Sequence, residues 1–151
     1  AIMIRINGDG ATHTGPAGTS AIPAEHLDTL KRAINILTTR IVGKYESDKA
    51  FKALPGGKSL TEMVNGTDIW VNYDPSNKQN DWGWTQPRLK PFDVVVTQFT
   101  LRMGRWSTVG TIVHEMAHLN GADGTSHAAE ETLKHSGLQS PNGPYDPSIR
   151  G

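Results

Sequence analysis

Two histidines and a glutamate in the segment TIVHEMAHLNGADGTSHAAEE, residues 111 to 131, have the types and spacing of a metal-dependent hydrolytic site. His114 and His118 are four residues apart, and Glu115 follows the first of them. On an α-helix, residues i and i+4 lie on the same face, so both imidazoles can point at one metal ion. Glu115 then stands beside that ion, where a carboxylate acts as the general base for water. This H-E-x-x-H pattern is typical of zinc metallopeptidases, and a purely structural histidine pair is the alternative.

A catalytic zinc ion needs a third protein ligand and a fourth position that stays open to water. The glycine-rich turn NGADGTS lets the chain reverse and return His127 to the metal-binding face. Glu130 and Glu131 follow on the next predicted helix and offer carboxylate ligands instead. We therefore predict one zinc ion bound by His114, His118 and His127, with Glu131 as the alternative third ligand.

Hydrophobic spacing predicts the helices that must position these residues. Apolar residues recur every three or four positions over residues 24 to 44, which predicts an amphipathic helix. A similar pattern over residues 107 to 120, with Ser107 as the N-cap, predicts the helix that carries the histidine pair. Ser59 and Glu62 form the pattern of a capping box at the start of a short helix. Shorter helical segments are predicted at residues 47 to 57, 59 to 66 and 126 to 136.

Strands are predicted where β-branched and aromatic residues gather, at residues 2 to 6, 68 to 74 and 93 to 99. Between the last two lies a segment predicted to be a polar loop, in which Trp82 and Trp84 either line a cleft or clamp the loop to the core. The elements together predict one α+β domain over residues 1 to 151, with a helical first half and a small twisted sheet. An extended peptide can add to a sheet edge, which we expect to be the segment 68 to 74 or 93 to 99.

The motif HEMAH followed by GTSH resembles the aspzincin metallopeptidases, the deuterolysin and peptidyl-Lys endopeptidase group, whose pattern is H-E-x-x-H followed by G-T-x-D. The resemblance covers residues 107 to 131 and implies a zincin-like fold. His114 and His118 match the first two zinc ligands and Glu115 matches the catalytic base. His127 stands where the family has its third ligand, an Asp, and a His there keeps a competent zinc donor.

A second departure from the family concerns the group that stabilises the oxyanion. The family has a Tyr shortly after its Asp, whereas this chain has Ala, Ala and Glu at residues 128 to 130. Another hydrogen-bond donor is then needed near the tetrahedral intermediate. We predict Tyr145 in the tail for this role, with His135, Tyr73 and Arg102 as alternatives.

Composition limits the partners of such a protein. The 151 residues carry 15 Lys plus Arg and 15 Asp plus Glu, so no overall field favours nucleic acid or an anionic membrane. No stretch approaches the roughly 20 apolar residues of a membrane span, which predicts no membrane insertion. The absence of cysteine leaves any metal to His, carboxylate and water. The predicted partners are a protein or peptide substrate and a cognate inhibitor or parent polypeptide.

Two other functions fit the same residues. The start at Ala1 suggests a processed form or a domain of a longer bacterial protein, secreted or delivered outside the producing cell as an effector that cleaves target proteins or cell-wall peptides. The missing family Tyr suggests a non-catalytic zinc-binding interaction module. A fourth coordination position filled by a protein side chain would favour the module.

Overall fold

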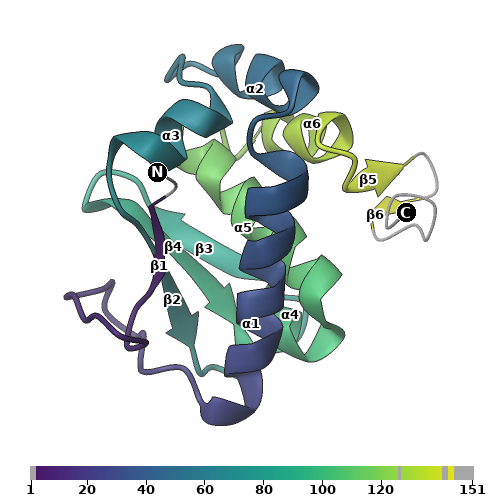
Figure 1. Cartoon of the computed structure of the whole chain (residues 1–151). Helices are drawn as coiled ribbons and strands as arrows, with labels where there is room; N and C mark the ends of the chain where they lie inside the picture. The colour runs from purple at the N-terminus through teal and green to yellow at the C-terminus, as the bar shows by residue number, and fades with distance from the viewer. Residues whose placement is uncertain (1–2, 126, 141–142, 145–151) are drawn as a thin grey trace.

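A computed structural model describes residues 3–125, 127–140 and 143–144 of the chain. Its central sheet has the strand order β1-β2-β4-β3 (Figure 1). The strands are β1 (Ile4–Ile6), β2 (Ile69–Asp74), β3 (Gly83–Gln86) and β4 (Lys90–Thr97). The first three in spatial order run parallel, and β3 pairs with β4 in antiparallel fashion at the edge. Val94, Val95 and Val96 in β4 are fully buried because both faces of this strand are covered.

Helices pack on this sheet and on one another, which confirms the predicted α+β class (Figure 1). They are α1 (Ala24–Ile36), the π-helical turn η1 (Leu37–Ile41), α2 (Tyr45–Lys52), α3 (Leu60–Gly66), α4 (Gln98–Met103), α5 (Arg105–Leu119) and α6 (Ala128–His135). A short hairpin of β5 (Gln139–Ser140) and β6 (Gly143–Pro144) follows α6. In the described part of the chain, none of the helices is long and apolar enough to cross a membrane.

Helix α5 is the central packing element of the fold. It contacts β3 and β4 of the sheet, while α1, α4 and α6 also pack against it. Ile112 and Met116 are completely buried on this helix. Each such side chain contributes roughly 1.5–3 kcal/mol through removal of apolar surface from water. The helix that carries the histidine pair is therefore held rigidly from several sides.

Several local predictions are confirmed in detail. Ser59 caps α3 by accepting a hydrogen bond from the backbone N–H of Glu62, and the Glu62 side chain accepts one from the backbone N–H of Ser59. Strands β1 and β2 lie within the predicted segments. The long first helix ends at Ile41 rather than near residue 44, and Gly43 has a positive φ of 86° that ends it.

The boundary between the sheet and α5 was predicted wrongly in two ways. The last predicted strand does not extend to residue 99, because Thr97 caps α4 by accepting a hydrogen bond from the backbone N–H of Thr100. Ser107 is not an N-cap, since Gly104 holds that position and Ser107 is buried inside the first turn of α5. Its hydroxyl lies 2.7 Å from the Thr100 hydroxyl, which ties α4 to α5.

Strand β3 was missed because it has only four residues and begins with a glycine. The segment predicted to be a loop pairs with β4, with Gly83 opposite Val96 and Trp84 opposite Val95. The indole N–H of Trp84 donates to the carboxylate of Asp74 at 2.8 Å. The edge strand beside α5 is therefore β3. The segments that became β2 and β4 were expected to provide a substrate-binding edge, but both are internal strands of the sheet.

Candidate metal centre

The side chains of His114 and His118 converge on one side of α5. Both are half-buried, and their Nε2 atoms lie 3.1 Å apart with the rings at 69° to each other. Two nitrogens bound tetrahedrally to one zinc ion, at about 2.0–2.1 Å each, are about 3.3 Å apart. The spacing of these two nitrogens therefore fits a shared metal ion.

The tautomer of His118 is determined by the turn that follows α5. Its Nδ1–H donates to the carbonyl oxygen of Ala122 at 2.9 Å. In the neutral ring, the lone pair then lies on Nε2, the atom that faces His114. This type of backbone hydrogen bond orients metal-binding histidines and increases their basicity.

The surroundings of His114 keep its imidazole neutral. Burial lowers the pKa of His114, and the nearby His118 lowers it further, while Glu130 acts in the opposite direction. A neutral imidazole at physiological pH is the form that binds a metal ion. The histidine pair therefore meets two requirements of a shared divalent metal ion, namely the spacing of the two Nε2 atoms and a neutral His114 ring.

Glu115 lies on the same helix but is more deeply buried, with 6% of its surface exposed. Burial raises the pKa of Glu115 to about 8, and the carboxylates of Asp81 and Glu130 contribute to the same direction. A carboxylate whose pKa lies near neutrality is suited to exchange protons with water during a reaction. A nearby cation would favour the ionised form and lower this pKa.

A cavity of about 370 Å³ opens beside these residues. It is lined by α5, by α6 and by the segment that leads into β3. His114 and Glu115 both contribute to its wall. The absence of a side chain at Gly83 lets β3 approach this wall closely. A Cβ at this position would lie only 2.5 Å from Thr111 Cγ2 and 3.5 Å from Glu115 Cγ. The cavity can thus place a ligand next to the sheet edge and the candidate base at the same time.

The third metal ligand is not determined by the observed geometry. Among the residues that the structure describes, no group of three or more His, Asp or Glu side chains is close enough together to hold a metal ion. His127 is the exposed N-cap residue of α6. The assignment of His127 as third ligand stays a prediction.

The two glutamates of α6 face different surroundings. Glu131 is exposed, and its carboxylate lies 3.8 Å from the Nε2 atom of His135 in the next helical turn. Glu130 lines the cavity together with His114. Its Oε2 atom is buried and has no hydrogen-bond partner among the described residues. Glu130, which the sequence offered only as one of two neighbouring carboxylates, is the described acidic side chain of α6 that faces the candidate centre.

The predicted oxyanion donors do not line this cavity in the described part of the chain. Tyr145 lies outside the described residues. Tyr73 is buried in β2, where burial first and Glu25 second raise its pKa. Arg102 is exposed and donates weakly to the Asn77 side chain at 3.4 Å.

Asn80 lines the cavity and was missed by the sequence analysis. Its φ of 62° places it in the left-handed region, which Asn adopts more readily than most residues. An Asn before a Trp-Gly-Trp segment is compatible with many loops, so the sequence offers no signal for this position. The side-chain amide provides a neutral hydrogen-bond donor at the cavity wall.

A comparison with protein-family models, curated proteins and solved structures found no match for this chain.

Proposed function

We propose that the protein is a zinc-dependent metalloendopeptidase with a zincin-like active site. The observation that carries the proposal is the convergence of the His114 and His118 Nε2 atoms, 3.1 Å apart, next to a cavity that His114 and Glu115 line. A structural histidine pair explains the contact between the rings, but it does not require a buried carboxylate at the same cavity wall. The H-E-x-x-H chemistry accounts for all three side chains.

The residues of the chain have separate roles in this proposal. His114 and His118 hold the zinc ion, which when bound supplies a Lewis acid that polarises the peptide carbonyl and acidifies water. Glu115 removes a proton from the attacking water and returns a proton to the amine that leaves. Burial of Glu115 in a cavity limits competing contacts with bulk solvent.

The free edge of β3 is the proposed binding site for the substrate backbone. It belongs to the edge strand of the four-stranded sheet, and Gly83 at its start lines the same cavity as Glu115. A peptide in extended conformation can hydrogen-bond to such an edge and bring one of its carbonyl groups to the cavity. Asn80 offers its side-chain amide in the cavity wall for that carbonyl.

The third zinc ligand can be identified with three single variants. His127→Ala tests the residue at the position of the aspzincin Asp, while Glu130→Gln and Glu131→Gln test the two carboxylates of α6. Zinc affinity should fall about 10-fold or more for the variant that removes a ligand. The other two variants change nearby residues of the same segment and serve as controls, because their zinc affinity should stay close to that of the wild type.

The proposed activity is tested by digestion of a denatured protein mixture with the zinc-loaded protein, followed by mass-spectrometric mapping of new termini. Glu115→Gln is the matched control, because it retains the size of the side chain and removes the base. New termini are expected with the wild type and not with the variant, although both bind zinc. Equal cleavage by the Glu115→Gln variant would refute the mechanism.

A non-catalytic zinc-binding module is the second candidate function. One observation favours it: no tyrosine is present in the described lining of the cavity, where the aspzincin resemblance would lead one to expect an oxyanion donor. Zinc bound by four protein side chains, seen by X-ray absorption spectroscopy, together with an absence of cleavage would support the module.

The biological setting remains part of the proposal. Delivery outside the producing cell as an effector, action on cell-wall peptides, and control by a cognate inhibitor or parent polypeptide are all compatible with a peptidase of this kind. Digestion of purified cell-wall peptides, with the same Glu115→Gln control, separates this substrate class from proteins.

A further inference from the structure

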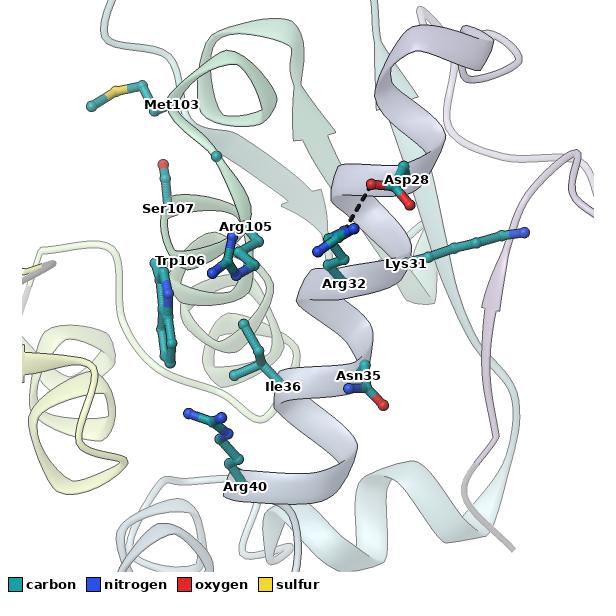
Figure 2. Close-up of a pocket in the computed structure, with 11 residues that line it drawn as sticks. Asp28, Lys31, Arg32, Asn35, Ile36, Arg40, Met103, Arg105, Trp106 and Ser107 are labelled. Atoms are coloured by element: carbon teal, nitrogen blue, oxygen red, sulfur yellow. Dashed lines mark hydrogen bonds and ion pairs between the residues drawn. The ribbon is translucent and has the colours of Figure 1, made fainter. Parts of the chain in front are cut away.

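A second cavity, of about 860 Å³, lies between α1 and the junction of α4 with α5 (Figure 2). None of the residues of the candidate metal centre lines it. From Arg105 to His114, α5 rises by roughly 14 Å at the usual helical rise per residue. The two cavities therefore use different stretches of the same helix.

Three arginine side chains from three elements turn toward this second cavity. They are Arg32 of α1, Arg40 of η1 and Arg105 of α5, and all three are exposed to solvent (Figure 2). Arginine is suited to recognise carboxylate groups because its planar guanidinium can donate two parallel hydrogen bonds. A convergence of three guanidinium groups on one space favours an anionic ligand.

The described lining of this cavity contains more basic than acidic residues. Among the described residues that line it, Asp28 is the only acidic one, and its carboxylate accepts a hydrogen bond from Arg32 Nε at 2.8 Å. Lys31 also contributes to the wall, but its side chain points away from the arginines and lies 3.5 Å from Asp9 (Figure 2). The formal charge of the whole chain is zero, so this excess of positive charge is local.

The start of α5 adds to the same electrostatic preference. Gly104 is the N-cap, no side chain in the described part of the chain caps this end, and the first turn contains no acidic residue. Instead, Arg105 places a positive charge near the positive end of the helix dipole, an arrangement that a nearby anion would stabilise. The start of α5 therefore favours an anionic ligand, as the three arginines do.

Apolar surface separates the arginines. Trp106 is half-buried, and the guanidinium of Arg40 lies 5.7 Å from the centre of its ring, in cation–π contact. Ile36 is buried beneath this space, and Met103, with 54% of its surface exposed, lies at its rim. A ligand that alternates charged and apolar groups would meet complementary groups along the whole cavity.

We propose that this cavity, the arginine cavity defined by Arg32, Arg40, Arg105 and Trp106, binds an acidic segment of a partner protein in extended conformation. Arg32 and Arg40 are eight residues apart, roughly 12 Å along a helix. Side chains four residues apart on an extended peptide are separated by about 13 Å. Carboxylates at such a spacing match the separation of the two arginines along the helix.

The proposal is tested by fluorescence anisotropy with a labelled peptide of about nine residues that alternates Glu and Leu. The full chain is used, and EDTA is present so that hydrolysis does not interfere. We expect saturable binding that weakens about tenfold or more when the NaCl concentration rises from about 50 to about 300 mM. The same peptide with Gln in place of every Glu should not bind.

Variants locate the binding site. The double variant Arg40→Gln/Arg105→Gln should weaken binding by about tenfold or more, since it removes two charge-assisted contacts. Arg88→Gln removes a charge from the exposed turn between β3 and β4 and should leave binding within about twofold of the wild type. Circular dichroism checks that each variant is folded.

Three results would overturn the proposal. The first is equal affinity of the wild type and the arginine double variant for the acidic peptide. The second is equal binding of the Glu and Gln peptides, a result that needs only the wild-type protein and so does not depend on the folding of a variant. The third is saturable binding of ATP without binding of the acidic peptide, because the occupant would then be a compact phosphate ligand.

Discussion

His13 Nε2 lies 2.6 Å from Oδ1 of Asp93. This contact connects the loop after β1 to strand β4, 80 residues further along the chain. Asp93 has 2% of its surface exposed, and Asn72 of β2 also donates to its Oδ1 at 2.9 Å. The His13 ring stacks on Trp70 with its centroid 4.6 Å from that of the indole. A polar network thus fixes the loop against the sheet.

This network predicts that His13→Ala destabilises the fold. The variant leaves the buried carboxylate of Asp93 with one partner fewer and removes the stacking on Trp70. We expect the free energy of unfolding to fall by about 2–3 kcal/mol, as measured by urea denaturation. Thr12→Ala, at the neighbouring exposed position, is the control and should change it by less than about 0.5 kcal/mol. An equal effect of both variants would show that the loop, and not the His13 contact, matters.

Gly83 predicts a second sensitive position. A Cβ there would lie 2.5 Å from Thr111 Cγ2 and 2.5 Å from the carbonyl oxygen of Val95, so β3 or α5 must move to accept it. We expect Gly83→Ala to destabilise the protein by about 1–3 kcal/mol and to lower peptide hydrolysis, because the same movement displaces the cavity wall beside Glu115.

Thermal unfolding and a peptidase assay measure the two effects of Gly83→Ala. Gly66→Ala, at the end of α3 where a Cβ meets no atom within 4 Å, is the matched control and should be neutral or slightly stabilising. Wild-type stability and activity in the Gly83→Ala variant would mean that β3 does not contact α5 as closely as the structure indicates.

The histidine pair could be predicted from the sequence because its geometry is local. A separation of four positions on one helix places His114 and His118 on the same face, whatever the helix packs against. The third ligand depends instead on how α6 packs against α5. Glu130 and Glu131 differ by one position, or about 100° around a helix, and only the packing of α6 decides that Glu130 faces the cavity.

Strand β3 could not be predicted for a related reason. Residues 83 to 86, GWTQ, include Trp and Thr, which favour strands, but the segment begins with glycine and is too short to show an apolar alternation. The pairing with Val95 and Val96 of β4 makes this segment a strand, and the absence of a side chain at Gly83 lets it approach α5. Both causes are long-range contacts, and a local pattern does not report them.

The raised pKa of Glu115 predicts a pH dependence of stability for the metal-free protein. The pKa of a glutamate side chain is ordinarily 4.5, and burial raises that of Glu115 to about 8 in the folded chain. Between these values the unfolded state has lost a proton that the folded state keeps, so stability falls as pH rises through this window and levels off above about 8. The full loss is on the order of a few kcal/mol.

Glu115→Gln should remove this dependence, because the amide does not titrate. Urea denaturation between pH 5 and pH 8, in the presence of EDTA, should give a flatter profile and a more stable protein at pH 8, by a few kcal/mol at most. Glu46→Gln, on the exposed surface of α2, is the control and should keep the wild-type profile. Parallel profiles for the wild type and Glu115→Gln would contradict the raised pKa.

Zinc should stabilise the wild type through the histidine pair. A ligand present at about 100 times its Kd adds about 2.7 kcal/mol, which corresponds to a rise in Tm of roughly 5–10 °C for a chain of this size. His114→Ala and His118→Ala should each abolish the shift, whereas His135→Ala, on the exposed side of α6, should keep it. Because burial and His118 lower the pKa of His114, protonation should begin to weaken the shift only below about pH 6.5. If the His114→Ala variant retained the full shift, the 3.1 Å contact between the two rings would be a structural hydrogen bond and the zinc ion would bind elsewhere.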